Sequence, residues 1–158
     1  MKPSHIARDG RVAMVDVSRK RVTSRHARAE ALVRMSRAAR EALQKATLPK
    51  GDAFVTAQLA GIMAAKQTAA LIPLTHPLPL SSVDVRFDWR SDGALRVEAE
   101  ARTSAQTGVE MEAMVAAAIA ALTIYDMSKS LDKGITIESI ALLQKSGGKS
   151  GTWRSKQR

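Results

Sequence analysis

A run of thirteen residues without a charged side chain, residues 113–125, limits the folds open to this chain. Its alanine, leucine and methionine residues favour an α-helix. A helix without a polar face has to be surrounded by protein on nearly all sides. The run is also too short and too rich in alanine to span a bilayer. We therefore expect a buried helix at about residues 109–131.

Four segments are expected to form β-strands. Residues 83–90 and 95–101 alternate between apolar and polar side chains on either side of the turn sequence RSDGA, which predicts a hairpin. Residues 27–35 also alternate, which indicates a strand, although the sequence RHARAEALVRM has good helix propensity as well. The segment GITIESIALLQK, residues 134–145, indicates a last strand.

Two further helices are predicted between the first strand and the hairpin. Ser36 is a suitable N-cap for a short helix that reaches Lys45, and the sequence Pro49-Lys50-Gly51 ends this helix. Asp52 is placed to cap a second helix that ends before Pro73.

With only the two long helices counted, the order of elements is strand, helix, strand, strand, helix, strand. This order predicts an α+β fold of the ferredoxin-like split β-α-β type (βαββαβ), a four-stranded antiparallel sheet with helices on one face. We expect a single domain at residues 13–146, a flexible N-terminal arm at residues 1–12 and a flexible basic Gly/Ser/Lys tail at residues 147–158. The sequence MVDVS, residues 14–18, is either a short strand or an ordered lead-in.

The chain of 158 residues has a formal net charge of +10. Such an excess favours polyanionic partners, but it is concentrated near both ends, where it can simply aid solubility. The absence of cysteine excludes disulfides, thiolate catalysis and cysteine metal sites. No apolar signal region stands at the N-terminus, so we expect a cytoplasmic location and no membrane partner.

The stretch QKSGGKSG, residues 144–151, looks like part of a phosphate-binding loop. A Walker A loop requires an earlier glycine where Leu143 stands, and a helix for which too few residues follow. An RNA-recognition motif is also disfavoured, because the strand sequence ALRVEAEAR lacks the aromatic residues on which bases stack. The stretch is therefore not a self-contained nucleotide cradle.

Several charged residues stand where elements are expected to end. Asp126 opposes the dipole of the predicted helix, and Lys129 follows on the same face, so the two form either a simple ion pair or a tuned acid–base pair. His76, in the proline-rich loop, is either functional or bonded to the main chain. Five lysines at element ends could meet one phosphate-rich ligand: Lys50, Lys66, Lys129, Lys145 and Lys149. The three histidines are scattered, so no metal site and no cofactor are expected.

Five sequence blocks, in one order, resemble the MoaC family, the cyclic pyranopterin monophosphate synthases of molybdenum cofactor biosynthesis. The blocks are MVDVSRK, KGD, LAGIMAAKQTAALIPLTHPLPL, TGVEMEAMVAAAIAALTIYDMSK and LLQKSGGKSG, and they extend from residue 14 to residue 151. The resemblance implies a lyase that converts 3′,8-cyclo-7,8-dihydroguanosine triphosphate to cyclic pyranopterin monophosphate with release of pyrophosphate. It also implies a ferredoxin-like subunit in a homohexamer, a trimer of dimers with sites between subunits.

The resemblance also implies roles for individual residues. The catalytic residues would be Asp126, Lys50 and Lys129. Those that bind substrate would be Leu74, Thr75, His76, Glu110, Met111, Glu112, Lys145 and Arg25. The family commonly has cysteine where this chain has Thr75 and Ser128, so a thiol role is excluded there. The basic charge keeps a nucleic-acid-binding module as the alternative, although no nucleic-acid partner is expected, and a non-catalytic scaffold is a third interpretation.

Overall fold

The computed structural model describes residues 10–156 of the chain. Residues 1–9 of the predicted N-terminal arm, and the last two residues of the predicted tail, lie outside this range. The segment at residues 14–18 is a lead-in and not a strand. Val15 and Val17 in it are half-buried, while Asp16 and Ser18 face solvent.

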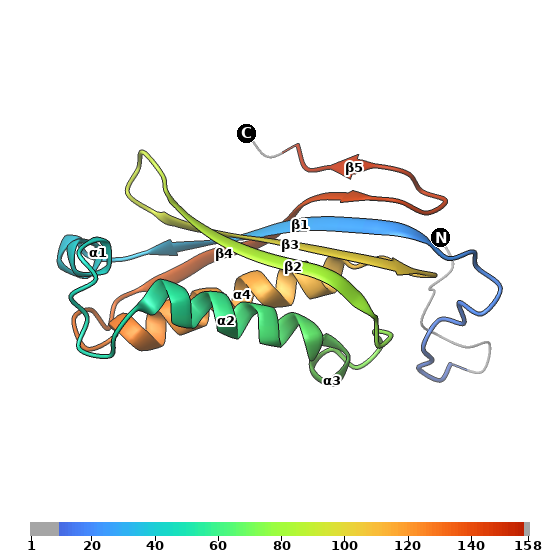
Figure 1. Cartoon of the computed structure of the whole chain (residues 1–158), viewed down its shortest axis with the longest axis horizontal. Coiled ribbons are helices and arrows are strands. Elements are labelled where there is room, and N and C mark those ends of the chain that lie inside the picture. Colours follow the sequence, from blue (N-terminus) through green and yellow to red (C-terminus); the bar gives the residue numbers. More distant parts are fainter. Residues whose placement is uncertain (1–9, 157–158) are drawn as a thin grey trace.

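The described residues form one five-stranded antiparallel sheet with the spatial order β2-β3-β1-β4-β5 (Figure 1). The strands are β1 (Thr23–Arg34), β2 (Leu80–Trp89), β3 (Leu95–Ala105), β4 (Thr136–Ser146) and β5 (Trp153–Arg154). The first four have the order of a split β-α-β fold, so the predicted fold class is confirmed. The short strand β5 was not predicted, and it pairs with β4 at Gln144 and Lys145.

The helices are α1 (Arg37–Gln44), α2 (Ala53–Lys66), α3 (Thr68–Leu71) and α4 (Glu110–Ser128). Ser36 and Asp52 cap α1 and α2 as predicted, with side-chain oxygens that accept from main-chain N–H groups of the first turn. The predicted second helix is interrupted at Gln67, where the Thr68 hydroxyl donates to the carbonyl of Ala65 at 3.0 Å. A hydroxyl that bonds a helix carbonyl in this way competes with the regular ladder.

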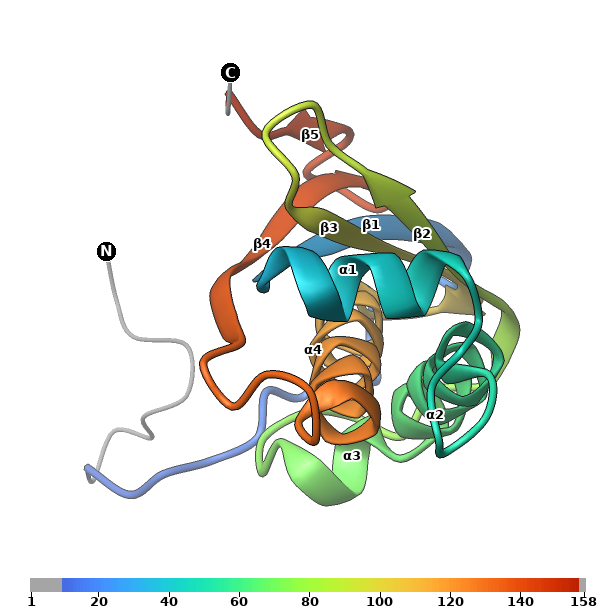
Figure 2. The ribbon, with the colours of Figure 1, turned by 90° about the vertical axis from the view of Figure 1, so that its left-hand side faces the viewer.

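Helices α2 and α4 lie side by side on one face of the sheet (Figure 2). The apolar side of β1 is fully buried on the face that α4 covers, at Ala27, Ala29, Ala31 and Val33. Gly61 of α2 permits close packing on α4, because a Cβ atom there would lie 2.9 Å from the carbonyl oxygen of Ala116. By length and composition α4 could cross a membrane, but 56% of its apolar window is buried, so it is a core helix.

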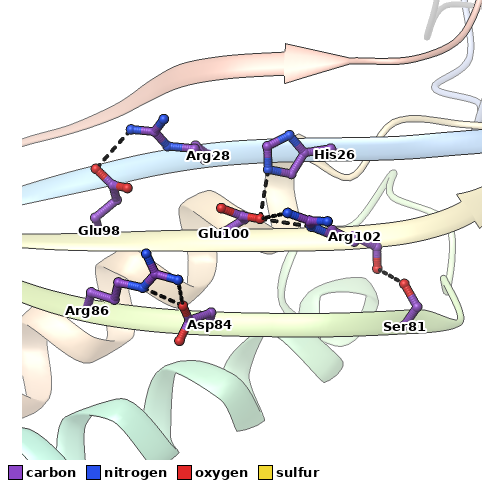
Figure 3. A network of polar contacts seen from close by, with 8 residues as sticks. All are labelled: His26, Arg28, Ser81, Asp84, Arg86, Glu98, Glu100 and Arg102. Carbon is purple, nitrogen blue, oxygen red and sulfur yellow. Dashed lines mark hydrogen bonds and ion pairs between the residues drawn. The ribbon is translucent and has the colours of Figure 1, made fainter.

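The other face of the sheet carries paired charges instead of apolar side chains (Figure 3). His26 contacts Glu100 at 3.1 Å, and Arg28 contacts Glu98 at 3.1 Å, in both cases between β1 and β3. On β2, Arg86 pairs with Asp84 at 2.6 Å. Opposite charges on neighbouring positions of a sheet face support the pairing of strands and keep this face hydrated.

Candidate active site

Lys50, Asp126 and Lys129 form one of two charged clusters. The Asp126 carboxylate accepts a hydrogen bond from Lys50 Nζ at 2.8 Å through Oδ2, and Lys129 Nζ lies 2.7 Å from Oδ1. Lys50 Nζ also donates to the main-chain carbonyl of Asp126 at 2.9 Å. The ion pair expected from spacing alone is therefore present, and a second lysine from a distant segment joins it.

Local structure explains how Lys50 reaches the end of α4. The N–H of Gly51 bonds the carbonyl of Leu48 at 3.1 Å, and Gly51 has φ +93°, a conformation that favours glycine. Asp52 follows directly as the N-cap of α2. The Lys50 ammonium satisfies one of the main-chain carbonyls that a helix leaves unpaired in its last turn.

The two lysines determine the protonation state of Asp126. Hydrogen bonds from Lys129 and Lys50 lower the pKa of the Asp126 carboxyl to about 2, so it is ionised at neutral pH. The same contact raises the pKa of the Lys129 ammonium, which therefore keeps its proton. The Asp126 side chain is 55% exposed, so the cluster is open to a ligand or to another chain.

The second charged cluster lies at the other end of α4 and surrounds a cavity of about 730 Å³. Arg25, Glu110, Lys145 and Lys149 line it, together with the main chain at the start of α4. Lys145 Nζ lies 3.3 Å from Glu110 Oε1 and donates to the Ser150 hydroxyl at 3.1 Å. Cationic side chains beside a helix N-terminus favour an anionic ligand.

The glycines of the stretch QKSGGKSG have a packing role beside this cavity. Gly147 and Gly148 have φ values of +95° and +72°, and a Cβ atom on either would overlap with Ser24 or Arg25. Arg25 in turn donates to the carbonyl of Ala105 at 3.4 Å through Nε and to that of Gln106 at 3.3 Å through Nη2. The two glycines therefore let the chain after β4 pack against the Arg25 guanidinium, whose orientation is fixed by these two hydrogen bonds.

An adjoining cavity of about 540 Å³ brings together most of the remaining predicted residues. Leu74, Thr75 and His76, from the loop before β2, line it opposite Glu110, Met111 and Glu112 of α4. The Thr75 hydroxyl donates to the carbonyl of Ile72 at 2.9 Å. His76 Nε2 lies 2.9 Å from the carbonyl oxygen of Val15, so the histidine is bonded to the main chain, and its role in substrate binding stays a prediction.

Glu112 is the most perturbed carboxyl group of this second cavity. Only 3% of the residue is exposed, and burial raises the pKa of its side chain to about 7, with a further contribution from the charge of Glu110. The group can therefore exchange a proton near neutral pH, unlike Asp126. A carboxyl group beside a cavity with a pKa raised by burial is a candidate acid–base group.

The structure does not bring all predicted residues together within one chain. Glu110 and Asp126 are separated by 16 positions of α4, or about 24 Å at the rise of an α-helix. Lys50, Asp126 and Lys129 line neither of these two cavities, nor the smaller one at Arg28 and Leu143. Arg25, Glu110 and Lys145 form one group with the loop at residues 74–76, and the Asp126 cluster forms another.

Sequence reasoning missed the residues that connect the two cavities. Lys20 and Thr107 line both of them, and Gln106 lines the first. The sequence Gln106-Thr107-Gly108 stands between the predicted strand and the predicted helix and has no pattern that indicates either element. A signal was available, because polar residues directly before a helix can present main-chain N–H groups to an anion.

Comparisons with known proteins agree with this arrangement. A model of the MoaC family matches residues 14–148. A cyclic pyranopterin monophosphate synthase of Nitratidesulfovibrio vulgaris is 54% identical over 153 residues, which cover 96% of this chain and 95% of that protein. One of Trichodesmium erythraeum is 54% identical over 155 residues, which cover 97% of this chain and 93% of that protein.

Proposed function

Because the chain belongs to the MoaC family, we propose that the two charged clusters are parts of one lyase active site. The activity of the chain is that of a cyclic pyranopterin monophosphate synthase in molybdenum cofactor biosynthesis. Its substrate is a GTP-derived precursor. The proposal adds the reaction, in which 3′,8-cyclo-7,8-dihydroguanosine triphosphate gives cyclic pyranopterin monophosphate and pyrophosphate, and the residues that carry it.

The contact of one carboxylate with two ammonium groups is the observation that carries the catalytic assignment. Asp126 is ionised at neutral pH, so it is the group of the cluster in the form that can accept a proton. Lys50 and Lys129 are the proton donors, and Lys129 is held protonated by the contact. Both ammonium groups also stabilise negative charge that develops on phosphate oxygens during ring closure and pyrophosphate departure.

The cavity lined by Arg25 and Lys145 is proposed to hold the triphosphate, and the adjoining cavity the ring system. Fixed positive charge beside a helix N-terminus supports the first assignment. Support for the second comes from its mostly apolar lining and from Glu112, whose raised pKa suits proton exchange with a nitrogen heterocycle.

We further propose that the active site is completed between subunits of a homohexamer, a trimer of dimers, in the cytoplasm. Two observations support shared sites. The Asp126 cluster is exposed and lies about 24 Å along α4 from Glu110. In addition, α2 carries an exposed apolar stripe of Val55, Leu59 and Met63 at helical spacing, which a second subunit would cover.

Pyrophosphate release from the cyclised GTP derivative tests the function. The wild-type protein is expected to release one pyrophosphate per substrate, and Asp126→Asn to release none while keeping the melting temperature of the wild type. Asp84→Asn, which removes a carboxylate from the open face of the sheet, is the matched control and should keep full activity. Turnover by Asp126→Asn at the wild-type rate would refute the catalytic assignment.

A further inference from the structure

The chain from Ser36 to Lys50, which we call the 36–50 segment, is attached to the end of α4 at two points, one on either side of α1. After α1, Lys50 Nζ bonds the Asp126 carboxylate at 2.8 Å. Before α1, the main-chain N–H of Ser36 donates to Asp132 Oδ2 at 2.7 Å. Figure 1 shows α1 and the connection from α4 to β4 at the same end of the molecule.

Asp132 stands in a tight turn that continues α4. The N–H groups of Leu131 and Asp132 both bond the carbonyl of Ser128, at 2.9 and 3.3 Å. Asp132 Oδ1 also accepts from the N–H of Gly134 at 2.8 Å, which closes the turn behind it. The same turn carries Lys129, so the place of Asp132 relative to the Asp126 cluster is fixed by main-chain hydrogen bonds.

The Asp132 carboxylate is used on both oxygens. The N–H groups of Ser36 and Gly134 lower the pKa of the Asp132 side chain, so it is ionised at neutral pH. Its negative charge lies at the start of α1, where the helix dipole favours an anion. Asp132 thereby joins two segments that stand 96 positions apart in the sequence.

The remaining contacts of the 36–50 segment are with other parts of the molecule. Ala39 and Leu43 are the buried residues of α1, and Leu48 is buried in the loop that follows. The Arg40 guanidinium lies over the ring of Trp89, 5.2 Å from its centroid, on the hairpin. Among the residues that the structure describes, the hydrogen bonds between this segment and the end of α4 are those of Asp132 and Lys50.

We propose that Asp132 is a positioning residue of the Asp126 cluster: it holds the start of the 36–50 segment on the turn after α4 and so keeps Lys50 in contact with Asp126. The inference rests on the proposed function only for its effect on catalysis. Its geometric part concerns contacts within the protein and is measured without substrate.

Asp132→Asn separates the link to Ser36 from the turn at Gly134. Asparagine keeps one side-chain oxygen, which suits the turn, but presents an NH2 group in place of the second acceptor. We expect the titration of Asp126, followed by NMR, to move to higher pH because the Lys50 contact is loosened. Loss of the Asp132 charge alone would move it to lower pH, since a nearby negative charge raises the pKa of a carboxyl group. An Asp126 titration that stays in place or moves down would overturn the proposal and show that Leu48 holds the segment by itself.

The Lys50→Met background shows which lysine is involved. In this background Asp132→Asn should no longer raise the titration of Asp126, because the contact that it loosens is already absent. An equal rise in both backgrounds would mean that Asp132 acts through Lys129, and would refute its role in placing Lys50.

The donor of the same hydrogen bond provides an independent variant. Ser36 has φ −63°, which proline adopts, so Ser36→Pro removes the N–H group in a compatible conformation. Ser36→Ala is the matched control, because both variants lose the capping hydroxyl and only alanine keeps the N–H group. Ser36→Pro should raise the titration of Asp126 above that of Ser36→Ala. Equal titrations in the two variants would count against the link.

Pyrophosphate release by Asp132→Asn measures the consequence for catalysis. We expect a rate at saturating substrate about tenfold to a hundredfold below the wild type, since a small displacement of a positioned group costs up to about a hundredfold. A raised titration of Asp126 together with release at the wild-type rate would refute the proposed function of the cluster and leave the positioning role of Asp132 standing.

Discussion

One ammonium group holds both the side chain and the main chain of Asp126: Lys50 Nζ lies 2.8 Å from Oδ2 and 2.9 Å from the carbonyl oxygen. The loop before α2 is thereby linked to the last turn of α4. The consequence for chemistry is that the protonation of Asp126 depends on a residue 76 positions away in the sequence.

Replacement of Lys50 by methionine is expected to raise the pKa of Asp126 above its present value of about 2. One of the two hydrogen bonds that stabilise the carboxylate disappears, and Lys129 alone remains. Carboxyl titration by NMR measures the change. Lys133→Met is the control, because Lys133 does not contribute to the lowered pKa. An unchanged titration in Lys50→Met would mean that the contact has no electrostatic effect.

The buried carboxyl group of Glu112 is expected to make the stability of the protein depend on pH. Its pKa rises on folding from the ordinary 4.5 to about 7, so between these values the folded chain binds more protons than the unfolded chain. The stabilisation that protonated Glu112 provides is fully present below pH 4.5, and it is lost as the pH rises to 7. We expect a fall of about 3 kcal/mol in the free energy of unfolding across this window.

Urea unfolding at several pH values measures this dependence. Glu112→Gln should remove the fall, whereas Glu110→Gln should retain it, because Glu112 remains buried. A stability of Glu112→Gln that declines with pH as steeply as the wild type would contradict the assignment.

Ser128 is expected to destabilise the fold slightly. The residue is fully buried, and its hydroxyl has no hydrogen-bond partner among the described residues. Replacement by alanine or by cysteine removes an unsatisfied hydroxyl, which we expect to raise stability by about 1 kcal/mol. Thermal unfolding of the two variants measures the gain. If both instead lower the melting temperature, the hydroxyl has a partner in the assembled protein.

Mixed oligomers test whether sites are shared between subunits. Asp126→Asn and Lys145→Met should each be inactive alone, because each lacks one cluster. Mixed and reassembled, the two variants should regain part of the activity, since some sites then receive one intact cluster from each chain. If all mixtures stay inactive while the hybrids form, both clusters must come from the same chain.

The sequence predicted the fold class because its signals were local. The two N-caps, Ser36 and Asp52, and the alternation of residues 83–101 each depend on neighbouring residues. The break at Gln67 and the strand β5 were missed, because a threonine hydroxyl and a two-residue pairing give no periodic pattern.

Only those contacts of the site that depend on neighbouring positions in the sequence could be predicted. Asp126 and Lys129 are three positions apart, so their contact followed from spacing. The approach of Lys50 to Asp126, and the presence of Lys20 and Thr107 in the same cavities, depend on tertiary structure, which spacing does not encode. The resemblance to the MoaC family identified Lys50 as a site residue, but it gave no geometric reason for the contact of Lys50 with Asp126.

Strand β5 gives the chain an optical reporter beside Lys145. Trp153 is the register partner of Lys145, so the two side chains lie on the same face of the sheet. The residue is 44% exposed, so its emission responds to the polarity around it. The other tryptophan, Trp89, lies on β2 at the opposite edge of the sheet, beneath the Arg40 guanidinium. A Trp89→Phe background would isolate the emission of Trp153, so that occupancy near Lys145 can be followed by fluorescence without a label.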